Sequence, residues 1–161
     1  MKQLLILIIL FYTGREKQDV PDNLFKSVSV FAGTSLCADF SRSFLKIPAG
    51  DKCDIVKWNL TFFNDDKTGV PLRFKLEREY GYHVDNRTYK TVNKDTIDGV
   101  CRKTTGSAYD PEATLIQLTT GSPEKQISFV KLDDNLIHLL DNSKKLVIGD
   151  AGQSFTLSRI K

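Results

Sequence analysis

The residues of this chain best suited to chemistry are its three cysteines, Cys37, Cys53 and Cys101. Thiols can form a disulfide, bind a metal or act as nucleophiles, and the redox state of the compartment decides between these roles. If the chain is exported, we expect a Cys37–Cys53 disulfide, because Cys101 lies in a separate segment that fits a half-buried strand. The bridge would close a loop of roughly 15 residues and stabilise the fold by ~3 kcal/mol. Three pairings are possible, and the sequence alone does not choose between them.

The two histidines, His83 and His138, are the other residues that could bind a metal or transfer protons. Neither lies at metal-ligand spacing from a cysteine, so we expect no metal site and no cofactor. His138 lies in the apolar stretch 136–140, where a structural role is expected. His83 lies among aromatic residues in the stretch 80–85 and is a candidate ligand-binding residue.

A catalytic constellation is not evident in the sequence. No serine stands in a Gly-x-Ser-x-Gly elbow, and nucleophilic catalysis needs a base and an orienting group close to the nucleophile. The pairs Asp65-Asp66 and Asp133-Asp134 lack the alternating acidic pattern of a calcium-binding loop and fit hairpin turns instead. We therefore expect a protein that is not an enzyme.

The beginning of the chain has the pattern of a secretory leader. Lys2 precedes the uncharged apolar run 4–12, which is shorter than the ~20 residues that a membrane-spanning helix needs. We expect residues 1–13 to be a signal peptide and residues 14–23 a flexible lead-in to one domain over residues 24–161. No cysteine ends the apolar run, so we expect a periplasmic or extracellular protein without a lipid anchor.

The charge composition argues against nucleic-acid binding. The formal net charge of +3 falls to +2 when Lys2 is removed with the leader. Charges of both signs alternate in residues 75–79, whereas nucleic-acid-binding proteins concentrate basic residues on one face. We expect no nucleic-acid partner and no membrane span. We expect a monomer whose candidate partners are a small apolar ligand or another envelope protein.

Most of the chain has the period-two pattern of β-strands. Apolar and polar side chains alternate in residues 54–62 and 70–77, and a turn cluster at 64–69 joins these runs into a predicted hairpin. The predicted inward residues are Val56, Trp58, Leu60, Phe62, Val70, Leu72, Phe74 and Leu76. Further strands are predicted at residues 88–92, 96–101, 113–118, 126–131, 136–140, 146–148 and 154–160. A short helix is expected within residues 41–47, where serine can cap and apolar residues can pack down.

These strands predict an all-β fold, a single antiparallel meander that closes into a small barrel of seven or eight strands. Closure removes the exposed strand edges. A barrel of this size has an interior that is filled by side chains or just large enough for a small ligand. The predicted inward side chains are large and favour a filled core: Trp58, Phe62, Phe74, Phe129 and Phe155.

The opening Phe31-Ala32-Gly33-Thr34-Ser35-Leu36-Cys37-Ala38-Asp39 resembles that of the NlpE N-terminal domain, a small antiparallel barrel of bacterial envelope lipoproteins associated with copper resistance and surface sensing. The closing segments 134–150 and 154–159 resemble those of NlpE-like and META-type barrels, and the whole is similar to exported proteins of Bacteroidota. Phe40 stands where the family has its second cysteine, so the resemblance implies the fold and the compartment but no copper or redox activity.

Three functions from different classes follow. The first is a non-enzymatic exported barrel that serves as a binding, sensing or accessory module of the cell envelope. The second is a lipocalin-like carrier of a small apolar ligand, with Trp58, Phe74 and Tyr80 lining the cavity. The third is a copper- or thiol-handling protein that uses Cys37, Cys53 and His83.

Overall fold

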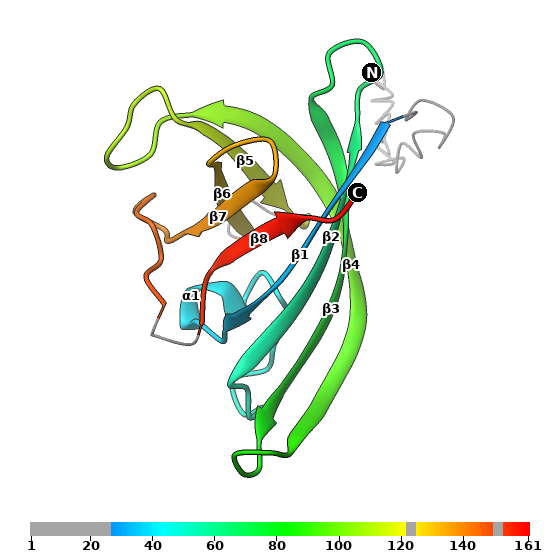
Figure 1. Ribbon diagram of the computed structural model, residues 1–161, viewed down its shortest axis with the longest axis vertical. Helices are drawn as coiled ribbons and strands as arrows, with labels where there is room; N and C mark the ends of the chain where they lie inside the picture. The colour runs from blue at the N-terminus through cyan, green and yellow to red at the C-terminus, as the bar shows by residue number, and fades with distance from the viewer. Residues whose placement is uncertain (1–26, 122–124, 150–152) are drawn as a thin grey trace, which may run out of the picture.

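The computed structural model describes residues 27–121, 125–149 and 153–161, so the predicted leader and lead-in lie outside the described residues. Eight antiparallel strands follow one another in chain order and close into a barrel, which confirms the predicted all-β meander. The strands are β1 (Ser27–Leu36), β2 (Ile55–Asn64), β3 (Pro71–His83), β4 (Tyr89–Thr105), β5 (Thr114–Thr119), β6 (Gln126–Lys131), β7 (Leu136–Leu140) and β8 (Thr156–Arg159). The long strands β1–β4 form one wall of the barrel, and the shorter β5–β8 form the other (Figure 1).

The barrel closes where β8 pairs with β1. Phe31 lies opposite Arg159, and the amide of Ile160 donates a hydrogen bond of 2.8 Å to the carbonyl of Val30. Gly33 lies at this junction, and a Cβ there would meet the carbonyl oxygen of Thr156 and the Cδ2 of Leu157 at 2.9 Å. The close approach of β8 therefore needs a residue without a side chain at this point of β1.

The segment 37–53 between β1 and β2, here named the plug, closes one end of the barrel. It contains the helix α1 (Asp39–Arg42), which begins two residues before the predicted range, with Ser41 inside the helix rather than at its N-cap. Phe44, Leu45 and Ile47 after the helix are buried in the main core, as the sequence predicted for the first two. The rings of Phe44 and Phe74 lie 5.9 Å apart, so the plug reaches into the barrel.

Three details of the predicted strands are wrong. Residues 88–92 and 96–101, predicted as two strands, belong to one continuous strand, β4, because the polar residues 93–95 between them also pair with β3. Residues 146–148 form only an isolated bridge from Leu146, since β7 already has β6 and β8 as neighbours. Leu72, predicted to face inward, is 43% exposed because a register shift after Phe63 interrupts the alternation.

Candidate ligand-binding site

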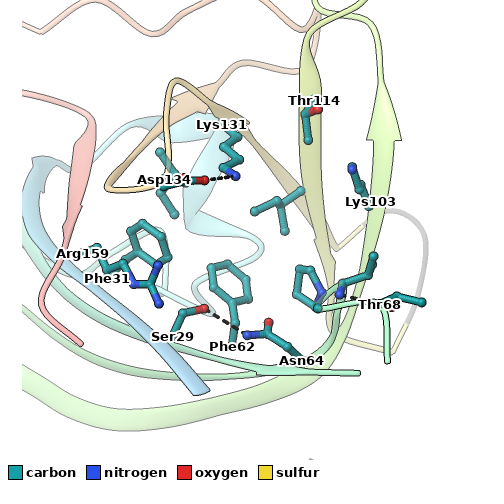
Figure 2. A pocket seen from close by; sticks show the side chains of 15 residues that line it. Ser29, Phe31, Phe62, Asn64, Thr68, Lys103, Thr114, Lys131, Asp134 and Arg159 are labelled. Atoms are coloured by element: carbon teal, nitrogen blue, oxygen red, sulfur yellow. Dashed lines mark hydrogen bonds and ion pairs between the residues drawn. The ribbon is translucent and has the colours of Figure 1, made fainter. Parts of the chain in front are cut away.

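A pocket of about 410 Å³ lies at the end of the barrel opposite the plug and is here named the mouth pocket. Ser29 and Asn64, which line it, lie at the other end of the β1–β2 ladder from Leu36 and Ile55, where the plug begins. Its volume falls within the range of ~300–1,000 Å³ found for sites of small ligands. Figure 2 shows the side chains that surround it.

The bottom of the mouth pocket is apolar and consists of four buried side chains, here named the floor. They are Phe31, Phe62, Ile116 and Ile137. The rings of Phe31 and Phe62 meet edge to face, with centroids 5.8 Å apart, which is a favourable aromatic geometry. Each floor residue belongs to the inward-facing row of its strand, so the same alternation that builds the core also builds the floor.

One wall of the mouth pocket is the β2–β3 turn, which includes Thr68, Gly69 and Val70. A carboxylate oxygen of Asp65 accepts hydrogen bonds from the hydroxyl of Thr68 at 2.7 Å and from its amide at 2.8 Å. These bonds to Thr68 lower the pKa of Asp65. Gly69 has a φ of 67°, a left-handed conformation that glycine adopts without strain. The turn is therefore held in one shape beside the pocket.

Three basic side chains, here named the rim cations, surround the opening above the floor: Lys103, Lys131 and Arg159 (Figure 2). Lys131 forms an ion pair of 2.5 Å with Asp134, and this bond lowers the pKa of that carboxyl group. The Nε of Arg159 donates a hydrogen bond of 3.1 Å to the carbonyl of Lys161. No ion pair of Lys103 is found within the described residues. The formal charge of the lining is thus +2, from three cations and Asp134.

The sequence could have revealed the rim cations, although they were not among the predicted site residues. Each lies two positions after a buried inward residue of its strand: Cys101 precedes Lys103, Phe129 precedes Lys131, and Leu157 precedes Arg159. Residues two apart in a strand face the same side, so these three cations also face the barrel interior. They lie at the same end of the barrel because β4, β6 and β8 run in the same direction.

The predicted ligand-binding residues Trp58, Phe74 and Tyr80 lie together in the packed core, and none of them lines the mouth pocket. The Nε1 of Trp58 donates a hydrogen bond of 2.8 Å to the hydroxyl of Ser35. The hydroxyl of Tyr80 donates one of 2.6 Å to Asp51 of the plug, and burial is the main cause that raises its pKa.

The fourth predicted ligand-binding residue, His83, lies apart from the others at the end of β3 and is exposed. Its ring lies 5.6 Å from that of Tyr89, and its Nδ1 lies 3.9 Å from a carboxylate oxygen of Asp54. The structure therefore brings three of the four predicted residues together, in the core, and leaves His83 on the surface.

An internal charge that the sequence did not single out lies between the core aromatics. Arg78 is 1% exposed, and it donates hydrogen bonds of 2.5 and 2.7 Å from Nε and Nη2 to the carboxylate of Asp95. Its guanidinium carbon lies 5.0 Å from the ring centre of Tyr80. The period-two pattern predicts its position, because it follows the inward residues Phe74 and Leu76 in β3.

The predicted disulfide Cys37–Cys53 is present and ties the two ends of the plug, with a Cα–Cα distance of 5.8 Å. Cys101 is free and buried inside the barrel, and burial raises the pKa of its thiol to about 12. His138 is held by Thr156 at 2.8 Å and by the carbonyl of Val147 at 3.0 Å. Within the described residues, no group of three or more His, Cys, Asp and Glu side chains is arranged to hold a metal ion.

Comparison with known proteins identifies no relative of this chain. No protein-family model matches it, and neither a curated protein nor a solved structure matches it. Among the residues that the structure describes, no helix is long and apolar enough to span a membrane.

Proposed function

We propose that this chain is a non-enzymatic binding module of the cell envelope, and that the mouth pocket is its ligand site. The observation that carries the proposal is the difference between the two ends of the barrel. One end is filled by the plug, whereas the other has an open pocket of about 410 Å³ with an apolar floor and a polar opening. Small-ligand sites combine these two features, and they are common in the mouths of β-barrels.

The proposal includes export to the periplasm or the outside of the cell. The Cys37–Cys53 disulfide supports it, because disulfides persist in oxidising compartments. It also includes a relationship to NlpE-like and META-like barrels, which the eight-stranded meander and the opening segment 31–39 support. Cell fractionation tests the export: most of the protein in the cytoplasm, with Cys37 and Cys53 reduced, would contradict it.

A lipocalin-like carrier of an apolar ligand is the second candidate function. The four floor residues favour it, since they offer an apolar surface at the bottom of the mouth pocket. In this version, Phe31 and Phe62 take the place of the predicted Trp58 and Phe74 as the lining aromatics. A copper- or thiol-handling role has no comparable support, because Cys37 and Cys53 are joined to each other.

Binding of two fluorescent probes tests the proposed site. 1-Anilinonaphthalene-8-sulfonate is anionic, and N-phenyl-1-naphthylamine has the same rings without the sulfonate. We expect saturable binding of at least one probe to the folded protein. Thr114→Trp should weaken this binding by about tenfold or more, because the indole would occupy the pocket that Thr114 lines.

The matched control is Thr96→Trp, which places the same ring on an exposed position of β4 away from the pocket. It should leave probe binding unchanged. Near-ultraviolet circular dichroism verifies that both variants keep native packing, so that probe binding to a partly unfolded state is excluded. The absence of saturable binding of either probe, or equal binding in Thr114→Trp and wild type, would contradict the proposed function.

A further inference from the structure

We propose that the mouth pocket selects an anionic amphiphile, a small apolar body that carries a carboxylate or a similar anionic group. This inference rests on the proposed function and names the chemical class of its ligand. It follows from the register of the strands, the charges of the rim cations and the shape of the pocket.

The register places every rim cation beside a floor residue. Lys103 lies directly opposite Ile116, Lys131 opposite Ile137, and Arg159 opposite Phe31. Directly opposite residues of an antiparallel pair point to the same face, with Cβ atoms about 5 Å apart. A ligand that rests on the floor therefore has its outer end within reach of cationic side chains from three different strands.

The side chains around the opening carry more positive than negative charge, with three cations and one carboxylate. Asp134 is already paired with Lys131, and its side chain is 82% exposed. Arg159 shares the charge of Asp134, whose pKa it helps to lower, and its Nε donates a hydrogen bond to the oxygen of Lys161. No ion pair of Lys103 is found among the described residues. An anionic group would supply the missing counter-charge, whereas a cationic ligand would meet net repulsion.

The chemistry of Arg159 and Lys103 fits an oxyanion. A guanidinium presents a fork of N–H donors to two oxygens, and an ammonium acts as a compact point charge beside it. The floor then contributes by burying the apolar body of the ligand. Head and body together distinguish this site from one for a free inorganic anion, which would use the rim cations alone.

Affinities for the probe pair give the first arm of the test. We expect the purified protein to bind the anionic sulfonate probe about tenfold more tightly than the uncharged amine. Lys103→Gln and Arg159→Gln should each weaken binding of the sulfonate probe by about fivefold, with the affinity for the uncharged probe unchanged within about twofold. In the double variant, the preference for the anionic probe should disappear.

Lys90→Gln is the matched control, because Lys90 is also an exposed lysine of β4 but lies in the part that pairs with Tyr82, away from the pocket. It should leave both affinities unchanged. Because Lys103 and Arg159 are exposed, we expect the variants to fold. Thr114→Trp should weaken the binding of both probes by about tenfold or more, as above.

Competition with unlabelled compounds gives the second part of the test. It distinguishes an anionic amphiphile from a free inorganic anion. Octanoate should displace the sulfonate probe, 1-octanol should need about tenfold higher concentration, and inorganic phosphate should not displace it. If phosphate displaces the probe as effectively as octanoate does, the proposal of an amphiphilic ligand is wrong, and the pocket is a site for a free anion. Equal binding of the two probes, or no effect of Lys103→Gln and Arg159→Gln, would overturn the anionic preference while the proposed function stands. Failure of both probes to bind would overturn both.

Discussion

The two ends of this barrel have the same strands and the same alternation, yet one is solid and the other is hollow. From one end, Phe44 and Leu45 of the plug enter the interior, and Phe44 reaches Phe74 of β3, which lies directly opposite the floor residue Phe62. At the other end, the inward row continues from Phe62 to a ring of polar and basic side chains, and no described segment fills the space. A loop between strands, rather than the strands themselves, thus determines whether a barrel end is core or binding site.

The comparison predicts different energetic roles for similar side chains. Residues of the plugged end are surrounded by protein on all sides, so their truncation leaves a closed cavity. Residues of the open end border a space that water can fill, so the structure there relaxes at lower cost. Substitutions at the plug should change stability most, and substitutions at the opening should change binding most.

The largest expected effect is that of Phe44→Ala at the plug. Removal of this buried ring should lower the free energy of unfolding by ~4 kcal/mol, the usual cost of a truncated core aromatic. The matched substitution Phe31→Ala at the open end should cost less, ~2–3 kcal/mol, because its cavity joins the mouth pocket. Urea denaturation measures both. A greater loss for Phe31→Ala than for Phe44→Ala would contradict the difference between the two ends.

The second effect concerns the disulfide that ties the plug. Cys37→Ser combined with Cys53→Ser should lower the free energy of unfolding by ~3 kcal/mol, since the unfolded chain gains the freedom of an open loop. Urea denaturation of this variant, with wild type under oxidising and reducing conditions as the control, measures the change. Peptide mapping without reductant should link Cys37 to Cys53, and a linked Cys101 would contradict the pairing.

The third effect lies midway along the interior, at the buried Arg78. Asp95→Asn removes its carboxylate partner and leaves a guanidinium that is 1% exposed without a counter-charge. We expect a loss of ~2 kcal/mol, less than the ~3–5 kcal/mol of a fully buried pair, because the Asp95 side chain is 40% exposed. Thermal or urea denaturation measures it. Glu77→Gln, which breaks a surface pair with Lys75, is the control and should have no measurable effect.

The same comparison explains which features the sequence could predict. Trp58, Leu60 and Phe62 follow strict alternation, so the β2 strand, its inward face and the barrel were predictable. Leu72 was misplaced because a register shift depends on the partner strand, which local periodicity does not contain. A predicted helix within residues 41–47 likewise does not tell whether Phe44 enters the barrel or covers its outside.

The mouth pocket was missed for a related reason. The aromatic residues with the strongest apolar signal, Trp58 and Phe74, fill the core, and a ligand site was expected beside them. The residues that line the opening are instead charged strand ends, which by themselves resemble ordinary solvated positions. Alternation places them in the inward rows of their strands, but their register with floor residues, such as Lys103 opposite Ile116, shows that they surround one pocket, and register depends on the closed sheet.

The smallest effect on stability is expected at the Lys131–Asp134 pair of the opening. Lys131 lowers the pKa of Asp134 below its ordinary value of 3.8. A carboxyl group whose pKa is lower in the folded state stabilises the fold above its unfolded pKa, and this contribution is lost as the pH falls through the folded value. Because the carboxylate is exposed, Asp134→Asn should lower the melting temperature only slightly near neutral pH. The difference from wild type should vanish in acid, and a difference that grows as the pH falls would contradict the direction of the shift.

Asp134→Asn should affect binding more than stability. Without Asp134, Lys131 loses its ion pair, and the formal charge of the lining rises from +2 to +3. Binding of the anionic sulfonate probe should tighten by about twofold at low salt and lose this gain at high salt, because exposed charges are screened. Lys131→Gln combined with Asp134→Asn should return the affinity to the wild-type value.

A plug variant such as Phe44→Ala should show the opposite balance. We expect a large loss of stability and, while the protein stays folded, a small change in probe affinity. The reason is that the Phe44 side chain lies outside the mouth pocket.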